Sequence, residues 1–238
     1  MENFFKELDN ELKELWETSL SQSEFISEVL TADIAKDLYA IYLTETFHYT
    51  SHNTKSQALV ATKIQQSTPQ NIQYMKFCLK HALEECGHEL MAFHDLQKLI
   101  GIENFSVEQL SPPLKQTQQL IDRIYEIAAG ENYLARLGYS YWAESSYGYF
   151  NEPLQALIKK LELKPSMLTF LVAHNDIDVD HFEDIKSIMK KMVKTDQDKD
   201  AIRKTMQETL KLTFGMLDGI MEVYKNPALA RAQYGFLR

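Results

Sequence analysis

The sequence predicts an all-α protein, a single-domain helical bundle of about eight helices, and three observations lead to this prediction. Apolar residues recur at three- and four-residue spacings along nearly the whole chain, and no alternating apolar and polar run indicates a strand. Only 8 Gly and 6 Pro occur among the 238 residues, so long turn-rich stretches are not expected. No internal repeat, low-complexity segment or linker divides the chain, and we therefore expect one domain over residues 1–238.

The N-terminal part is predicted to form helices over about residues 3–19 and 23–30. A third helix is expected from about Asp33 to Thr50, with a second start near Lys55. Pro69 opens a long helix that ends near Gly101, because Pro is favoured in the first turn and Gly just after the last. Apolar residues lie on two sides of this long helix, which predicts that it is central in the bundle.

The C-terminal part begins with a connector that ends at Pro112–Pro113. A break near Asn151–Pro153 and a short tail from about Pro227 are expected from their helix-breaking residues. The helices predicted between these points cover about residues 113–129, 131–150, 154–164, 166–193 and 196–225.

The composition excludes several classes of protein. A net charge of −9 argues against nucleic acid as a partner, because binding phosphates requires clustered Lys and Arg. No run of 18 apolar residues is present and residues 1–3 do not begin a signal peptide, so a cytoplasmic protein without a membrane span is expected. Cys78 and Cys86 would lie roughly 12 Å apart on one helix, too far for a disulfide, so both thiols are expected to be reduced.

The most informative motif is a set of three polar side chains at helical spacing. His174, Asp178 and His181 are separated by four and three residues, so on a helix they fall within roughly 60° of one another. Two imidazoles and one carboxylate that point the same way are suitable ligands for a transition metal. The motif therefore predicts a metal site.

Polar residues also occupy core-facing positions on other predicted helices. Glu45 and His48 continue the apolar stripe of their helix, and Glu144 lies in a strongly aromatic block. A Glu that is hydrogen-bonded to a Tyr would explain Glu144 without a metal. The long central helix adds His81, Glu84, Glu85 and His88, and the pattern alone does not choose among them. Several helices that each bring an inward carboxylate or imidazole are typical of bundles that hold two metal ions.

Together these residues resemble the haem-oxygenase-like diiron oxidases, within the wider group of TENA/THI-4 and PqqC-like folds, over about residues 30–220. The resemblance rests on the 174–181 motif, on Glu144, on Glu85-x2-His88 within EECGHELMAFHDLQKLIG and on TETFHYTSH at 44–52. It implies as metal ligands Glu85, His88, Glu144, His174, Asp178 and His181. Glu45, His81 and Glu84 are further candidates, since some members place the first carboxylate where this chain has His81.

The resemblance implies an O2-dependent non-haem dinuclear iron oxidase or oxygenase, a homodimer that acts on a small organic substrate such as a fatty acid or an amino acid. Mixed nitrogen and oxygen ligands without a thiolate suit two Fe, or alternatively Mn/Fe. His48, Tyr141 and Tyr147 are expected to line the substrate pocket, although core packing would equally explain the aromatic residues.

Three alternatives remain open. A metal-free TENA/PqqC-like enzyme would use a cysteine nucleophile, which leaves the 174–181 motif unexplained. A haem protein would require His48 or His52 as the iron ligand. A non-catalytic binding protein of the same fold would bind metal weakly and consume no O2.

Overall fold

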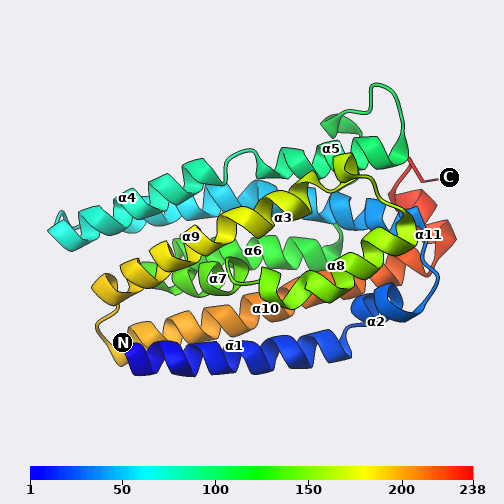
Figure 1. Cartoon of the computed structure of the whole chain (residues 1–238). Coiled ribbons are helices and arrows are strands. Elements are labelled where there is room, and N and C mark those ends of the chain that lie inside the picture. Colours follow the sequence, from blue (N-terminus) through cyan, green and yellow to red (C-terminus); the bar gives the residue numbers. More distant parts are fainter. Residues whose placement is uncertain (238) are drawn as a thin grey trace.

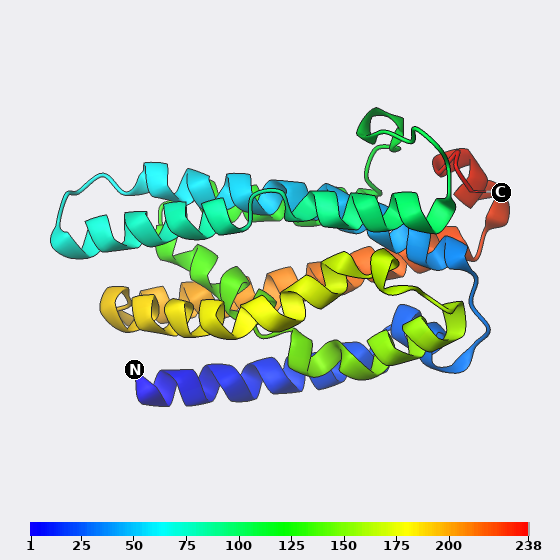
Figure 2. The ribbon, with the colours of Figure 1, turned by 45° about the horizontal axis from the view of Figure 1, so that its top comes forward.

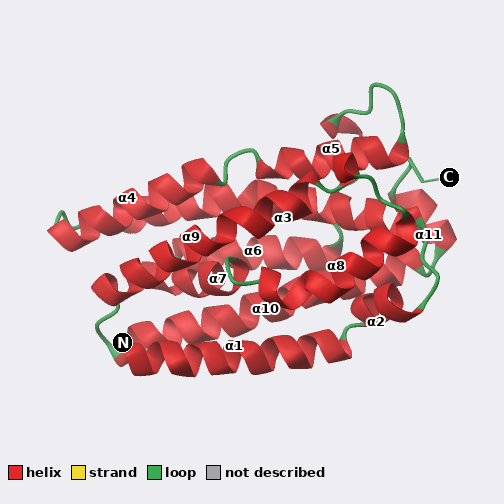
Figure 3. Cartoon of the chain, in the orientation of Figure 1, coloured by secondary structure: helices red, strands yellow, loops and turns green. Residues whose placement is uncertain are grey.

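The computed structural model describes the backbone of residues 1–237 and their side chains except those of Tyr147 and residues 174–180. All regular elements in this part of the chain are helical, as Figure 3 shows, so the all-α prediction is confirmed. Eleven α-helices are present in the described chain, more than the eight expected. They are α1 (Glu2–Gln22), α2 (Glu24–Thr31), α3 (Lys36–Lys63), α4 (Pro69–Glu84), α5 (His88–Ile100), α6 (Lys115–Ala129), α7 (Arg136–Ala143), α8 (Tyr147–Leu161), α9 (Thr169–Met192), α10 (Asp196–Tyr224) and α11 (Pro227–Gln233), with short 3-10 turns at Val107–Gln109, Tyr133–Ala135 and Pro165–Met167.

The long helices lie roughly along one common direction and form an elongated bundle (Figure 1). Helix α3 contacts α4, α5, α6 and α10, and α10 also contacts α1 and α7, so α3 and α10 organise the bundle. The N- and C-terminal ends of the chain lie at opposite ends of the bundle in both views (Figures 1 and 2). None of the described helices combines the length and the apolar composition that crossing a bilayer requires.

Several helix boundaries lie where the sequence predicts them because their capping groups are local. The Thr68 hydroxyl accepts a hydrogen bond from the backbone N–H of Asn71, and Pro69 opens α4. Gly101, with φ of +62°, ends α5 in the left-handed conformation that favours glycine. Thr195 and Asp198 form a reciprocal capping box at the start of α10.

Two predicted helices are each broken into two. The helix expected from Pro69 to Gly101 is interrupted at residues 85–87, where Gly87 has φ of +98°. The helix expected over 131–150 is interrupted at residues 144–146, between α7 and α8. Helical periodicity continues across both breaks, and the breaks are therefore not visible in the apolar pattern.

Three further expectations about boundaries are wrong. Helix α8 continues through Pro153, where a break was expected, so this Pro costs one backbone hydrogen bond within the helix. Helix α3 runs without interruption to Lys63. The expected tail after Asn226 contains a short helix, α11, whose first residue is Pro227 and whose N-cap is the Asn226 side chain.

The expectation that the 69–100 segment is central is also wrong. Its apolar stripe faces solvent, since Ile72, Leu79, Leu83 and Leu90 have exposed fractions of 41%, 51%, 76% and 44%. Helices α4 and α5 therefore lie at an edge of the bundle, and their opposite side, with the buried His81, faces the interior.

The start of α9 is fixed by a side chain from another helix. Asp95 of α5 is fully buried and accepts hydrogen bonds from the backbone N–H groups of Thr169 and Phe170, at 3.0 and 2.9 Å. The Thr169 hydroxyl donates a third, at 2.7 Å. Because Leu168 offers no side-chain cap, Asp95 supplies the anionic cap that this helix lacks locally.

Candidate metal centre

Four side chains from separate segments converge inside the bundle. His81, Glu85, Glu144 and His181 each offer one ligand atom, and these atoms all lie within 4.8 Å of one another. They come from α4, the turn after α4, the end of α7 and the middle of α9. Metal–ligand bonds of about 2.0–2.2 Å place donors on opposite sides of an ion about 4 Å apart, so small side-chain movements would close this cluster around a cation.

Glu144 occupies the middle of the cluster. Its Oε1 atom lies 3.1 Å from Nε2 of His81, and its Oε2 atom lies 3.3 Å from Nδ1 of His181. Glu85 completes the set, with Oε1 at 3.8 Å from Nδ1 of His181 and Oε2 at 3.2 Å from Nδ1 of His88. Each oxygen of the Glu144 carboxylate therefore faces a different imidazole of the cluster.

Two ring nitrogens of the cluster have unused hydrogen-bonding capacity. Nδ1 of His81 and Nδ1 of His181 are buried, and neither has a hydrogen-bond partner among the described residues. The 3.3 Å approach of Glu144 to Nδ1 of His181 is close enough for an ion pair but lacks hydrogen-bond geometry. Buried polar atoms are normally satisfied, so Nδ1 of His181, which faces Glu85 and Glu144, fits a site that accepts a cation.

The pKa values of the cluster reflect strong coupling between acids and imidazoles. Burial raises the pKa of Glu144, but the contacts with His181 and His81 outweigh it and bring this pKa down to about 2. The same contact with Glu144 raises the pKa of His181 to about 8, against the opposing effect of burial. Without metal, the cluster is therefore held by protonated imidazole and ionised carboxylate, and a cation would replace the protons.

Both central carboxylates lie at helix breaks. Glu85 occupies the C-cap position of α4, and Glu144 occupies the C-cap position of α7. A negative side chain is disfavoured at a helix C-terminus, where the backbone carbonyls already concentrate negative charge. A positive partner, either imidazolium or a metal ion, compensates for this placement.

The structure brings most of the predicted ligands together. Glu85, His88, Glu144 and His181 converge as expected, and His81 joins them. Glu84 approaches the edge of the cluster, with Oε2 3.7 Å from Nε2 of His181, and its side chain is 36% exposed. The remaining predicted ligands, His174 and Asp178, lie outside the described side chains.

Glu45 is buried in a different place. Its carboxylate accepts hydrogen bonds from the backbone N–H of Leu114 at 3.0 Å, the Tyr234 hydroxyl at 2.7 Å and the Thr117 hydroxyl. These three donors use both of its oxygens. Glu45 therefore links α3 to the start of α6 and to the C-terminal segment, and it is not part of the cluster.

The predicted pocket residues do not line the cavity that adjoins the cluster. His48 directs Nε2 to the carbonyl oxygen of Ser111 at 2.7 Å. The Tyr141 hydroxyl donates to Asp9 at 2.5 Å, and its ring packs against Phe182. Neither residue is therefore part of the lining of this cavity, and Tyr147 lies outside the described side chains.

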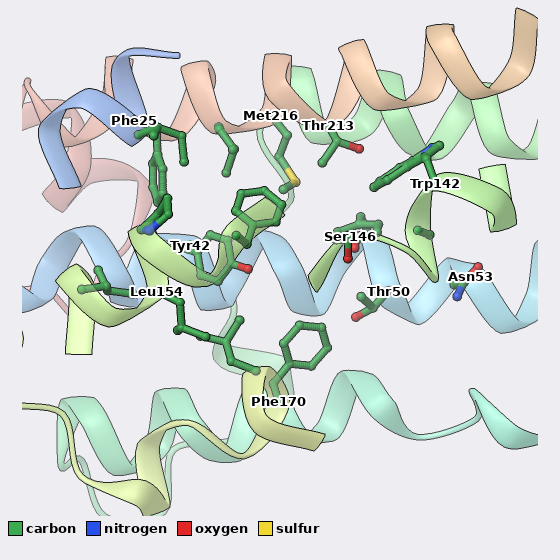
Figure 4. Close-up of a pocket in the computed structure, with 18 of the residues that line it drawn as sticks. Phe25, Tyr42, Thr50, Asn53, Trp142, Ser146, Leu154, Phe170, Thr213 and Met216 are labelled. Atoms are coloured by element: carbon green, nitrogen blue, oxygen red, sulfur yellow. The ribbon is translucent and has the colours of Figure 1, made fainter. Parts of the chain in front are cut away.

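A cavity of ≈ 160 Å³ adjoins the cluster, and Glu85 and Glu144 form part of its wall. Figure 4 shows Phe25 and Leu154 toward one end and Asn53 and Trp142 toward the other. Its lining is Phe25, Ile26, Val29, Tyr42, Tyr49, Thr50, Asn53, Glu85, Tyr139, Trp142, Ala143, Glu144, Ser146, Phe150, Pro153, Leu154, Leu157, Phe170, Leu171, Thr213, Met216 and Leu217.

Sequence analysis missed most of this lining. A usable signal was present on α3, because Tyr42, Tyr49 and Asn53 follow one another at spacings of seven and four and so share a helix face. The contributions of α2, α8 and α10 depend on tertiary packing, which no local pattern specifies.

Comparison with known proteins agrees with this fold. Residues 40–214 match the family described as iron-containing redox enzyme. A domain of unknown function with a haem oxygenase-like fold from Shewanella denitrificans is 40% identical, with 93% of each chain covered and a TM-score of 0.86. Among curated proteins, none matches the chain.

Two TenA homologues share the fold at low identity. The homologue from Pyrococcus furiosus is 16% identical, with a TM-score of 0.69 over 91% of this chain and 99% of its own. The homologue from Pseudomonas syringae pv. tomato is 12% identical, with a TM-score of 0.68 over 92% and 93%. The expected resemblance is thus confirmed: the chain has the haem-oxygenase-like fold and belongs to the family of iron-containing redox enzymes.

Proposed function

We propose that the protein is an O2-dependent non-haem dinuclear iron oxidase or oxygenase that acts on a small, largely apolar organic substrate. One observation carries the proposal: Glu85 and Glu144 belong both to the His/Glu cluster and to the wall of the apolar cavity. A substrate in this cavity would contact the metal ligands directly. Membership of the iron-containing redox enzyme family supports the same chemistry.

The donor set fits iron. His81, Glu85, Glu144 and His181 supply mixed nitrogen and oxygen donors, which suit iron or manganese. Nε2 of His81 and Nδ1 of His181 face Glu144 and are available as ligands. These four residues would hold one ion, and Glu144 would be shared with the second.

The second ion would use the remaining ligands. His88, which contacts Glu85 through Nδ1, is placed beside the first set. His174 and Asp178 share a helix face with His181 by their spacing, so we assign them to this ion. Fe/Fe and Mn/Fe occupancy are both compatible with these donors.

Bound iron would supply one-electron and O2 chemistry, and the protein's own contribution is binding, orientation and exclusion of water. The cavity wall is mainly aromatic and aliphatic, and its charged members in the described chain are Glu85 and Glu144. The cavity therefore favours a substrate that is mostly apolar. A polar group of this substrate would face the cluster, because the rest of the described wall offers no charged partner.

The alternatives receive less support. Burial raises the pKa of the Cys78 thiol to about 12, which opposes a role for this residue as the nucleophile of a metal-free enzyme. Nε2 of His48 contacts the carbonyl oxygen of Ser111, and Nδ1 of His52 contacts the Tyr125 hydroxyl at 2.9 Å. Neither histidine reaches the cavity that could hold a ligand.

The decisive experiment is an anaerobic Fe(II) titration of the metal-free protein, followed by addition of O2. We expect two equivalents of iron to bind and O2 to produce a transient visible absorption. Glu144→Ala should lose both ions, His174→Ala and Asp178→Ala should each lose about one, and His52→Ala should bind two. Unchanged iron stoichiometry in Glu144→Ala, or no O2-dependent change in the wild type, would refute the proposal.

A further inference from the structure

Arg136, at the start of α7, is a buried cation that the proposed function does not use. Its side chain is among the largest that are fully buried, with an exposed fraction of 1%. The guanidinium donates to Oγ of Ser140 at 2.8 Å and to Oδ1 of Asn53 at 2.5 Å, and it lies 4.1 Å above the ring of Tyr139. Within the described part of the chain, these hydrogen bonds go to neutral groups and not to a carboxylate.

Burying a guanidinium without a carboxylate partner costs desolvation free energy, and this cost points to a role for Arg136 beyond packing. Burial lowers the pKa of Arg136, and the more distant carboxylate of Glu144 is among the groups that oppose this shift. A guanidinium stays charged in proteins, and its Nε–H here has no hydrogen-bond partner among the described residues. An apolar side chain of similar length would fill the same volume without the desolvation cost.

The amide of Asn53 connects this cation to the metal centre. A guanidinium only donates hydrogen bonds, so the amide oxygen of Asn53 must face Arg136. The amide nitrogen then faces Glu85, and Nδ2 lies 3.5 Å from Oε2 of this carboxylate. Figure 4 shows Asn53 at the same end of the cavity as Trp142.

This relay acts on one specific oxygen. Oε2 of Glu85 lies near donors from both Asn53 and His88, at 3.5 and 3.2 Å. Oε1 is left to face His181, the neighbouring ligand of the cluster. Asn53 and His88 thus both face Oε2, which leaves Oε1 as the oxygen that would be available to a metal.

We propose that Arg136 is a positioning residue of the metal centre: by fixing the Asn53 amide, it holds Glu85 in the rotamer that directs Oε1 to the ion. This inference rests on the proposed function, because it presumes that the cluster binds metal. The partners that orient metal ligands commonly change metal affinity by about 10- to 100-fold when they are removed.

The test measures Mn(II) affinity of the metal-free protein by electron paramagnetic resonance, with thermal unfolding as a second measurement. Asn53→Ala removes the relay but keeps the buried charge, and Arg136→Met removes the donor to Asn53 while its side chain fills a similar volume. We expect each to weaken Mn(II) binding by about tenfold, and the double variant to lose no more than either single variant, because the two residues act in series.

Ser140→Ala is the matched control, since it removes the other hydrogen bond of Arg136 and leaves the path to Glu85 intact. It should bind Mn(II) within about twofold of the wild type. Wild-type affinity in Asn53→Ala, or additive losses in the double variant, would overturn the relay while the proposed function stands. Absence of Mn(II) and Fe(II) binding by the wild type would overturn both.

Discussion

Replacing Gly138 by Ala tests a close approach between helices α7 and α10. A Cβ atom at this position of α7 would lie 2.0 Å from the carbonyl oxygen of Ile202 and 2.9 Å from the backbone nitrogen of Met206, both in α10. Since the obstacle is backbone, the helices must separate. Overpacking costs about 3 kcal/mol at the upper end of its usual range, and the better helix propensity of Ala returns about 1 kcal/mol. We expect a net loss of about 2 kcal/mol, or about 4–8 °C in the unfolding temperature.

The assay is thermal unfolding of the metal-free protein, combined with Mn(II) binding. Glu144 is the residue directly after α7, so displacement of this helix should also weaken metal binding. Gly215→Ala is the matched control, because nothing lies within 4 Å of a Cβ added at that position of α10. This variant should be stabilised by about 0.5–1 kcal/mol. If Gly138→Ala unfolds at or above the wild-type temperature, the close contact between α7 and α10 is refuted.

Three further predictions concern the cluster and α9. The affinity of the metal-free protein for Mn(II) should rise with pH through about 8, because the contact with Glu144 raises the pKa of His181 to about 8 and this proton must leave; a flat profile between pH 7 and 9 would contradict it. The stability of the metal-free protein should fall over the same pH range. The folded pKa of His181 lies above its ordinary value of 6.5, so the contribution of His181 to stability is complete below pH 6.5 and is lost as pH rises through about 8. Urea unfolding at each pH measures this loss, with His181→Ala as the control. Asp95→Ala should lower the free energy of unfolding by about 2 kcal/mol, because it removes the cap of α9. Hydrogen exchange of the backbone amides of Thr169 and Phe170 should then be faster than in the wild type, and equal exchange rates would refute the capping role.

The fold class and many helix ends could be predicted because their causes are local. Thr68–Pro69 and Gly101 specify the ends of a helical segment through capping groups within a few residues. The inward side of that segment could not be predicted, because Leu79 and Leu83 form an apolar stripe as convincing as the buried one. Only the tertiary packing of α3 and α9 against the opposite side decides which stripe is covered.

The candidate site could be predicted in part for the same reason. Spacings of three and four residues identified His181 and the His81–His88 segment as ligand sources. They could not choose among the members of that segment, because on an unbroken helix residues three, four or seven apart share a face. The break at Gly87 removes this degeneracy, since it ends the helical geometry between Glu85 and His88.

Gly87 therefore provides a test of the link between helix breaks and ligand placement. Its φ of +98° is unfavourable for an L-residue with a Cβ, although no atom lies within 4 Å of the added carbon. Gly87→Ala should cost about 1–2 kcal/mol of stability through backbone strain alone. Strain is relieved if α4 continues past Glu85, which already has helical backbone angles, and this would move His88 away from Glu85, so Mn(II) affinity should fall by about tenfold.

Gly101→Ala separates strain from function. Gly101 also has a positive φ, +62°, and open space around its Cβ position, but it lies at the far end of α5 from the cluster. Both variants should lose similar stability, and only Gly87→Ala should lose metal affinity. Equal metal affinity in the two variants would mean that the turn at residues 85–87 is only a connection between helices. A selective loss would mean that the break itself places His88 against Glu85, which explains why a glycine interrupts an otherwise continuous helical pattern at the candidate metal centre.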